Sequence, residues 1–271
     1  MTYLCDLHLH STASDGQHHP AEVVRMAKEK GLQVIALTDH DTTDGVSEAV
    51  QSGAEAGLRV IPGIEMSARE YKIFHILGYG MNVDAPGFQE AMQRWRVGRE
   101  ERGERTTKYL NQRGFPISFS EVEALAEGAV IGRPHFARVM LRHGWGSSWK
   151  ELFDLYLDSD EFHQVVDYDK PCARECIDTI KSAEGYVSLA HPYQTGLQGE
   201  ELEALVRRMK DWGLDAIECY HSGHTEPMAE EYLQMAKRFG LYITGGSDFH
   251  GKMIKPEIDI VKLELELSFL I

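Results

Sequence analysis

The stretch LCDLHLHSTASDG, residues 4–16, places two histidines inside an apolar run that reads as a buried strand. His8 and His10 are two residues apart, so on a strand their side chains point to the same face. Burying an imidazole ring without a polar partner costs free energy, and something must compensate both rings. Two histidines on one face are placed to share a metal ion, which would supply the missing partner.

Strand and helix patterns alternate on both sides of a central region of the chain. We predict strands at 2–10, 32–40, 58–65, 72–80, 186–191, 214–221, 241–250 and 260–270, and helices at 20–31, 42–57, 172–185, 200–213 and 230–240. Such alternation implies a parallel sheet, and this many strands in one chain favours an irregular (β/α) barrel. Residues 1–85 and 170–271 would form the barrel, and the mainly helical residues 86–169 an inserted subdomain.

The composition limits the classes of function. The chain has 271 residues and a net charge of −15, which opposes a broad nucleic-acid surface but permits a small phosphorylated substrate if bound cations reverse the charge locally. No apolar run is long enough to span a membrane, and no basic-then-apolar leader is visible. None of the four cysteines forms a C-x-x-C pair, so we expect reduced thiols in a cytoplasmic protein.

Histidines and acids gather where the predicted strands end, and in a barrel those ends meet at one rim. A lone histidine is more often an ordinary surface or core residue, and His18, His19, His143 and His163 keep that interpretation. Six histidines and three carboxylates at strand ends are harder to attribute to chance. The candidate ligands are His8, His10, Asp15, His40, Glu65, His75, His191, Asp248 and His250.

Nine groups are too many for one ion, and with one bridging carboxylate they suit three divalent ions. Imidazole and carboxylate without thiolate fit zinc, manganese or Fe(II), and the sequence does not choose among them. Three carboxylates and three divalent ions would leave the site at about +3, which suits a phosphate ester.

These pieces resemble the polymerase and histidinol phosphatase (PHP) family of metal-dependent phosphoesterases. The matching motifs are DLHLHSTASDG, LTDHDTTDG, PGIEMS, HILGYG, LAHP and GSDFHG, in the order of the family and spanning residues 6–251. The resemblance implies a distorted (β/α)7 barrel with a trinuclear site at its rim. Because paired divalent ions lower the pKa of water, we expect hydroxide held by the metals to attack phosphorus.

The resemblance also implies how the ligands are shared. His8, His10, Glu65 and Asp248 would hold the first ion. Glu65 would bridge to a second ion held by His75 and His191, and Asp15, His40 and His250 would hold the third. We count Glu65, Asp248 and His191 as catalytic as well. Asp39 and Asp41, which flank His40, are expected to contact the ligands without binding the metals themselves.

The helical insertion, IGRPHFAR (131–138) and YHSGHT (220–225) are similar to one branch of the family. That branch contains 3′,5′-nucleoside bisphosphate phosphatases and 5′→3′ exoribonucleases. Arg133 and His135 are our first candidates for the clamp on a second phosphate, because guanidinium binds phosphate through two hydrogen bonds. The alternative is that Arg133 pairs with an acid at a helix start.

Further candidates lie elsewhere in the chain. Arg99 and Arg102 belong to an arginine-rich helix whose interleaved glutamates favour a solvated face, yet these two arginines are the ones most able to reach the site. His221 or His224 would protonate the leaving oxygen, unless both are ordinary loop residues.

The leading interpretation is therefore a phosphatase that hydrolyses a phosphomonoester of a compound such as adenosine 3′,5′-bisphosphate. One alternative is a 5′→3′ exonuclease on short RNA. Another is a phosphatase of the histidinol-phosphate type, which the helical insertion disfavours. A non-catalytic metal module associated with a polymerase is opposed by the complete ligand set. A small nucleotide or short RNA is the expected partner, with no membrane and no stable protein partner.

Overall fold

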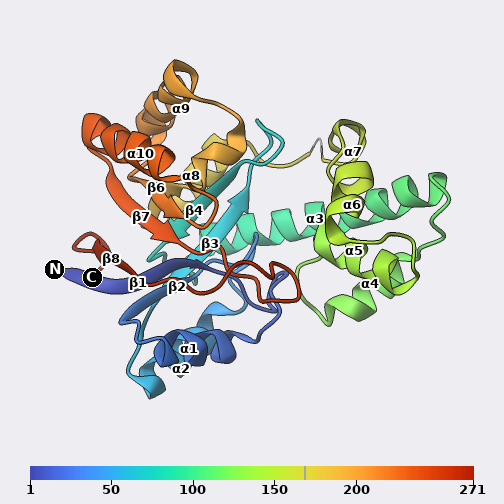
Figure 1. Cartoon of the computed structure of the whole chain (residues 1–271), viewed down its shortest axis with the longest axis horizontal. Coiled ribbons are helices and arrows are strands. Elements are labelled where there is room, and N and C mark those ends of the chain that lie inside the picture. The colour runs from blue at the N-terminus through green and yellow to red at the C-terminus, as the bar shows by residue number, and fades with distance from the viewer. Residues whose placement is uncertain (168) are drawn as a thin grey trace.

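The structure is a computed structural model that describes residues 1–167 and 169–271. Its centre is one sheet that curls into a nearly closed barrel (Figure 1). The strands are β1 (Thr2–Leu9), β2 (Val34–Leu37), β3 (Arg59–Ser67), β4 (His75–Tyr79), β5 (Tyr186–Leu189), β6 (Ala216–His221), β7 (Tyr242–Gly246) and β8 (Leu263–Glu266). Their spatial order is β7-β6-β5-β4-β3-β2-β1-β8, and a bridge between Leu9 and Phe249 brings the two sides together. The predicted distorted barrel with a helical insertion is confirmed.

Two strands run against the parallel direction that the alternation predicts. β4 is antiparallel to both β3 and β5, and β8 is antiparallel to β1. Only residues 68–74 join β3 to β4, which is too short for the crossover that a parallel pair requires. The reversal has a useful result, because His75 begins β4 opposite Ser67 at the end of β3 and so reaches the rim where β3 ends.

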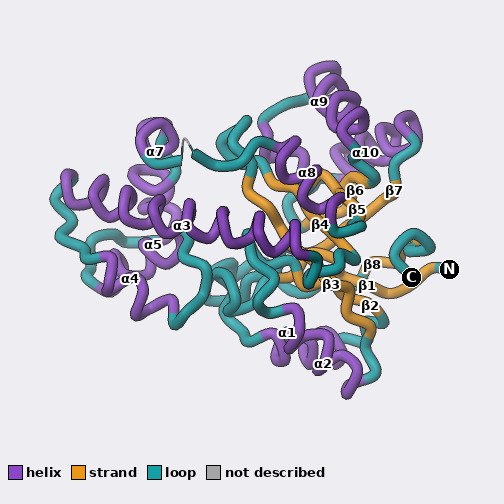
Figure 2. Tube along the Cα trace, turned by 180° about the vertical axis from the view of Figure 1, so that it is seen from behind, coloured by secondary structure: helices purple, strands orange, loops and turns teal. Residues whose placement is uncertain are grey.

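Helices cover the outside of the barrel on two sides (Figure 2). They are α1 (Pro20–Glu29) and α2 (Val46–Ala56) on one side, and α8 (Ala173–Ser182), α9 (Gly199–Trp212) and α10 (Glu226–Phe239) on the other. Each pair of layers encloses an apolar core: Val23, Val24 and Ala49 pack with Ile35 on the first side. Among the described residues, no helix is both long and apolar enough to cross a membrane.

The helical insertion forms a second lobe beside the barrel (Figure 1). It contains α3 (Pro86–Gln112), α4 (Phe119–Ala126), α5 (Arg133–Arg142), α6 (Trp149–Leu152), a π-helix (Phe153–Leu157) and α7 (Asp160–Val165). The lobe has a core of its own, in which Tyr109, Phe136, Met140 and Phe162 are buried. α3 is about 40 Å long at 1.5 Å per residue, and it runs from the barrel into the lobe.

The tail strand is shorter than its sequence pattern predicts. β8 covers Leu263–Glu266 and pairs with β1 at Thr2–Cys5, after which the chain turns and buries Leu267 and Phe269. The alternation from 260 to 270 therefore describes a strand and a following turn that face the same core.

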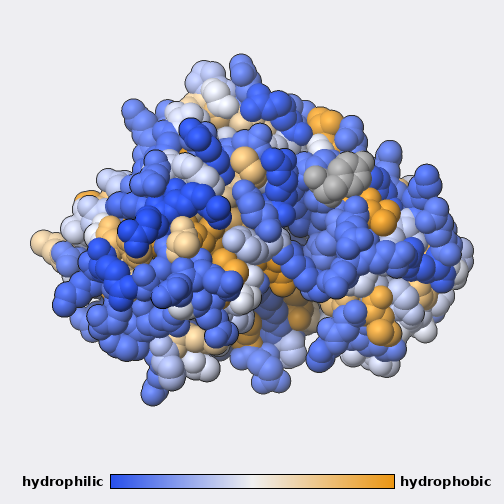
Figure 3. All heavy atoms as spheres, turned by 90° about the horizontal axis from the view of Figure 1, so that it is seen from above, coloured by the Kyte–Doolittle hydropathy of each residue, from blue (hydrophilic) through white to orange (hydrophobic). Residues whose placement is uncertain are grey.

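The outer face seen in Figure 3 is mainly hydrophilic, with hydrophobic residues in small separate patches.

Candidate metal centre

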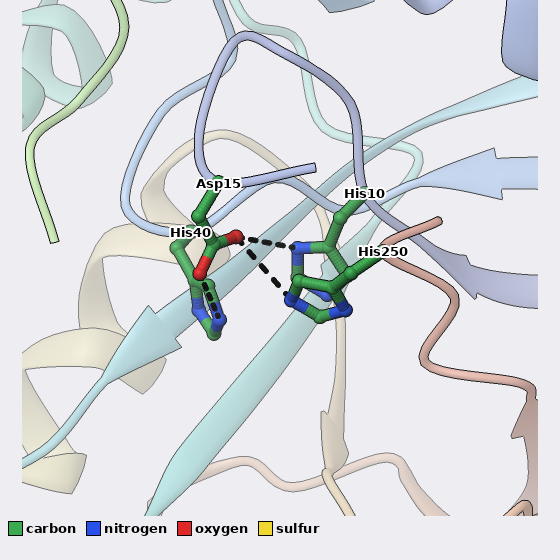
Figure 4. Close-up of side chains that lie close together, drawn as sticks. All are labelled: His10, Asp15, His40 and His250. Carbon is green, nitrogen blue, oxygen red and sulfur yellow. Dashed lines mark ion pairs between the residues drawn. The ribbon is translucent and has the colours of Figure 1, made fainter. Parts of the chain in front are cut away.

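The structure brings all nine predicted ligands together at the rim of the barrel. One cluster is built by loops that follow β1, β2 and β7: the Asp15 carboxylate faces the rings of His10, His40 and His250 (Figure 4). Its Oδ1 lies 3.3 Å from His250 Nε2 and 3.9 Å from His10 Nδ1. Its Oδ2 lies 3.9 Å from His40 Nε2. The donors therefore surround a common point, although they come from segments far apart in the sequence.

Glu65 joins the remaining ligands, because its two oxygens face different histidines. Oε2 lies 3.3 Å from His8 Nε2, 3.2 Å from His10 Nε2 and 3.1 Å from His40 Nδ1. Oε1 lies 2.8 Å from both His75 Nδ1 and His191 Nε2. A carboxylate used in this way is suited to bridging two ions.

Asp248 completes the group around His8 and His10. Its Oδ1 lies 3.4 Å from His10 Nε2 and 3.8 Å from His8 Nε2. His8, His10, Glu65 and Asp248 thus place one donor atom each within 4.8 Å of one another. This foursome is the same set that the family resemblance assigns to the first ion.

Several of these donor atoms are buried without a hydrogen-bond partner in the described structure. They are His8 Nε2, both ring nitrogens of His10, His40 Nδ1 and Glu65 Oε2. A buried polar atom without a hydrogen bond is destabilising, so these atoms are available to a ligand from outside the chain. Imidazole nitrogens and carboxylate oxygens in this arrangement fit divalent transition metals. Burial favours the neutral acid of Glu65, but the charges of His40, His75 and His8 hold its pKa well below the usual range.

Unusual backbone geometry presents two of the ligands. His191 has φ 23° and Asp248 has φ 57°, values that non-glycine residues rarely adopt. Gly246, two residues before Asp248, allows β7 to pass close to β1, because a Cβ there would lie 2.4 Å from the backbone nitrogen of His8. The rim is thus held in a conformation that ordinary strand ends do not have.

Asp39 and Asp41 support the ligand loops. Asp39 accepts hydrogen bonds from the Ser11 backbone N–H at 2.8 Å and from the hydroxyls of Ser11 and Ser14 at 2.7 and 2.6 Å, which fixes the turn that carries Asp15. Asp41 accepts from the Ser67 backbone N–H at 2.7 Å and from Arg99 Nε at 2.7 Å. Asp41 therefore links the His40 loop to α3.

Sequence reasoning missed two carboxylates that lie beneath the ligands. Asp6 on β1 and Glu218 on β6 have no exposed surface. Asp6 accepts from the backbone N–H groups of His8, Ser247 and Val261 at 3.2, 2.9 and 3.0 Å, and burial raises its pKa to about 6. The available signal was an acidic residue in the middle of an apolar strand.

A cavity of about 420 Å³ extends from the ligand cluster to the helical lobe. On the barrel side it is lined by seven of the predicted ligands. The lobe contributes apolar side chains, among them Phe136, Trp149 and Phe153. Cationic side chains also line it: Arg99, Arg102, Arg133, Lys150, Lys170 and Lys255. Metal ligands, cations and aromatic rings thus share one space.

Each arginine predicted to bind substrate has an acidic neighbour. The Arg133 guanidinium pairs with Asp158, and that of Arg99 with Asp41 at 2.5 Å. Arg102 Nε lies 3.7 Å from Asp169 and 3.9 Å from Asp167. The pairing of Arg133 is the alternative that the sequence left open, and it does not prevent Arg133 from lining the cavity.

Two predicted substrate residues are not among the described lining of this cavity. His135 is buried, and its Nδ1 accepts from the Gly132 backbone N–H at 3.1 Å, where it caps α5. His224 Nδ1 lies 3.0 Å from the Cys219 carbonyl oxygen, and with His221 it lines a second cavity of about 280 Å³. Burial lowers the pKa of each to about 4, so both rings are neutral at pH 7.

Three lysines that the sequence analysis did not single out also line the main cavity, and two of them lie beside acids within it. Lys255 Nζ lies 2.5 Å from Asp248 Oδ2, and Lys170 Nζ lies 2.7 Å from Asp167 Oδ2. Burial outweighs the attraction of Asp167 and lowers the pKa of Lys170 to about 8. No short motif distinguishes either lysine in the sequence.

Comparison with known proteins gives a consistent picture. The model of the family described as PHP domain matches residues 6–243. A 5′-3′ exoribonuclease of Haemophilus influenzae is 35% identical over 253 residues, which cover 92% of this chain and 91% of the relative. A 3′,5′-nucleoside bisphosphate phosphatase of Chromobacterium violaceum is 30% identical over 247 residues, covering 90% and 86%. The solved structure of an amidohydrolase from Chromobacterium violaceum, with bound sulfate and no metal, superposes with a TM-score of 0.87 at 28% identity, covering 97% and 92%.

Proposed function

The chain belongs to the PHP domain family of metal-dependent phosphoesterases, and from this premise we propose that it hydrolyses a phosphomonoester of a nucleoside 3′,5′-bisphosphate. One observation carries the proposal: a single cavity joins the ligand cluster to cations and to an aromatic wall. A nucleoside bisphosphate has three parts to bind, which are the reacting phosphate, the second phosphate and the base. The cavity offers a suitable surface for each.

We propose that three divalent ions, of manganese, iron or zinc, occupy the ligand cluster. His8, His10, Glu65 and Asp248 would hold the first, Glu65, His75 and His191 the second, and Asp15, His40 and His250 the third. When bound, such ions lower the pKa of water and offset the charge of phosphoryl oxygens. Glu65 would offer Oε2, which faces His8 and His10, to the first ion and Oε1, which faces His75 and His191, to the second.

The second phosphate is proposed to bind the cations of the lobe. Arg133 lies at the start of α5 and lines the cavity, and Arg102 and Lys170 line it as well. A guanidinium that already pairs with a carboxylate still has other N–H donors to offer to phosphate. Sulfate bound in the Chromobacterium violaceum structure supports the expectation that this fold accepts a tetrahedral anion.

The base is proposed to lie against Trp149 and Phe153. The centroids of the two rings lie 6.3 Å apart with an interplanar angle of 28°. Both side chains are half-buried and line the cavity. Stacking of a base on an aromatic ring typically contributes about 1–3 kcal/mol and tolerates any base. This wall therefore supports a nucleoside over a simple alkyl phosphate.

A second candidate activity is 5′→3′ exonucleolytic cleavage of short RNA. The relatives from Haemophilus influenzae and Escherichia coli are named 5′-3′ exoribonucleases, at 35% and 31% identity. The same ligands and the same aromatic wall would serve a terminal nucleotide. A phosphatase of the histidinol-phosphate type is less well supported, because its small substrate would leave the aromatic wall of the lobe unused.

The cysteine spacing favours a cytoplasmic location.

The test is a substrate panel with Mn²⁺ supplied. Adenosine 3′,5′-bisphosphate, 3′-AMP, 5′-phosphorylated oligoribonucleotides and histidinol phosphate are compared by phosphate release, and the oligonucleotides also by gel electrophoresis. We expect the highest kcat/KM on the bisphosphate. Progressive shortening of RNA with a higher kcat/KM would make the exonuclease the principal activity. Turnover of neither nucleotide nor RNA would overturn the proposal.

A further inference from the structure

Glu218 is a buried acid that touches two predicted metal ligands without lining the cavity. It lies within β6, and both of its oxygens are used. Oε1 lies 2.9 Å from His8 Nδ1, and Oε2 accepts a hydrogen bond from the His191 backbone N–H at 2.7 Å. The described lining of the substrate cavity does not include Glu218. Its place in the fold therefore points to a role that acts through other residues.

We propose that Glu218 is a positioning residue that fixes the tautomer of His8 and the backbone at His191. An ionised carboxylate only accepts hydrogen bonds, so the proton of the neutral His8 ring must sit on Nδ1. The lone pair is then on Nε2, the atom that lies 3.3 Å from Glu65 Oε2 and has no hydrogen-bond partner in the described structure. The inference rests on the metal-binding role of His8 in the proposed function.

The second oxygen acts on a strained residue. His191 has φ 23° and ψ 68°, and its Nε2 lies 2.8 Å from Glu65 Oε1. A non-glycine residue keeps such a backbone conformation only when its surroundings hold it there. The hydrogen bond from the His191 N–H to Glu218 Oε2 is one such restraint. Glu218 thereby directs two histidines from different strands toward the same bridging carboxylate.

Glutamine cannot replace glutamate in this role, although it has the same shape. Both groups that face residue 218 donate a hydrogen bond, whereas an amide has one acceptor oxygen and one donor nitrogen. If the amide oxygen serves the His191 N–H, its NH₂ faces His8 Nδ1 and favours the tautomer with the proton on Nε2. If the oxygen serves His8, two donors face each other at His191. Either arrangement disturbs a ligand.

Asp6 provides the matched control. It is as buried as Glu218 and also touches His8, but only through the backbone N–H, and its other partners are backbone N–H groups too. Asp6→Asn removes one buried negative charge close to the ligands and, like Glu218→Gln, sets an amide NH₂ against a backbone N–H, but its side chain faces no imidazole nitrogen. It therefore separates the loss of charge and the conflict with a backbone N–H from the loss of the tautomer restraint.

The first measurement uses the ¹⁵N-labelled, Zn²⁺-loaded protein. Long-range ¹H–¹⁵N spectra report which ring nitrogen carries the proton, with the His8 signals identified from a His8→Gln sample. We expect the proton on Nδ1 in the wild type and in Asp6→Asn, and the loss of that signal in Glu218→Gln. A wild-type His8 ring protonated on Nε2 would overturn the inference, even if neither Glu218→Gln nor Asp6→Asn folds.

The second measurement is the affinity for Zn²⁺ by competition with a chromophoric chelator. Loss of a partner that orients a metal ligand typically weakens binding about 10- to 100-fold, so we expect Glu218→Gln to weaken one equivalent to that extent. Wild-type affinity together with a wild-type tautomer in Glu218→Gln would refute the role. A wild-type protein that binds no divalent metal would instead refute the proposed function, and the two failures are thus distinct.

Discussion

The pairing of Arg133 with Asp158 allows a direct test of the phosphate clamp. Asp158 also lies 2.9 Å from His163 Nε2 and 3.6 Å from Lys72 Nζ, so Arg133 belongs to a charged network that joins the lobe to the link between β3 and β4. If Arg133 only holds this network together, removing the charge of Arg133 or of Asp158 should change the kinetics in the same way. If Arg133 binds the phosphate that is not cleaved, only its own removal affects the choice of substrate.

The comparison uses Arg133→Ala and Asp158→Asn, each on adenosine 3′,5′-bisphosphate and on 3′-AMP. Loss of a charge-assisted hydrogen bond costs about 1.5–3 kcal/mol, which corresponds to roughly 10- to 150-fold in kcat/KM. We expect Arg133→Ala to lose this much on the bisphosphate and little on 3′-AMP. Asp158→Asn keeps the guanidinium and should keep the ratio between the two substrates within a few-fold of the wild type.

The ratio of kcat/KM values is the quantity to measure, because a general folding defect cancels in it. Metal content is determined in parallel, since none of the nine candidate ligands is altered. Equal losses on both substrates in Arg133→Ala would mean that Arg133 serves the reacting phosphate or the fold. A change of the ratio in Asp158→Asn as large as that in Arg133→Ala would show that the network, and not the arginine, sets the preference.

Three further predictions concern the metals and the pH dependence of stability. Glu65→Gln should lower kcat more than tenfold in a protein that is folded by circular dichroism, because it removes a charge that faces two groups of histidines; a smaller effect contradicts the bridge. Chelation should abolish phosphate release and Mn²⁺ should restore it, whereas full activity of a preparation shown to be metal-free would exclude the mechanism. Because burial lowers the pKa of His135 from 6.5 to about 4, the unfolded chain binds this proton first as the pH falls from 6.5 toward 4. The free energy of unfolding should therefore drop by about 2–3 kcal/mol by pH 4.5, and urea titrations of His135→Gln should lack that part of the drop.

The sequence was most informative where periodicity and strand ends coincide. The alternation of strands and helices predicted the barrel, and reading the strand ends gave the nine residues that the structure brings to one rim. The direction of β4 was missed, because apolar alternation is the same in both directions. What decides the direction is the length of the link 68–74, and that link was not weighed.

Partners that come from distant segments were beyond the reach of the sequence. Glu218 lies 210 residues from His8, and no spacing rule connects them. Asp158 is 25 residues from Arg133, in a segment that reads only as a helix with an apolar face. His135 lies in the motif IGRPHFAR, from which we expected a phosphate-binding residue. Its side chain is instead buried and caps α5. Local patterns predict which residues are unusual, whereas the fold decides what each one faces.

The separate core of the helical lobe has an evolutionary consequence. All nine candidate ligands lie outside residues 86–169, and the lobe packs around its own buried side chains. Mutations in the lobe away from the Arg99–Asp41 pair can therefore change the cation-rich, aromatic wall while the ligands on the barrel stay the same. Proteins that share the barrel and its ligands can therefore differ in substrate specificity through changes in the lobe alone.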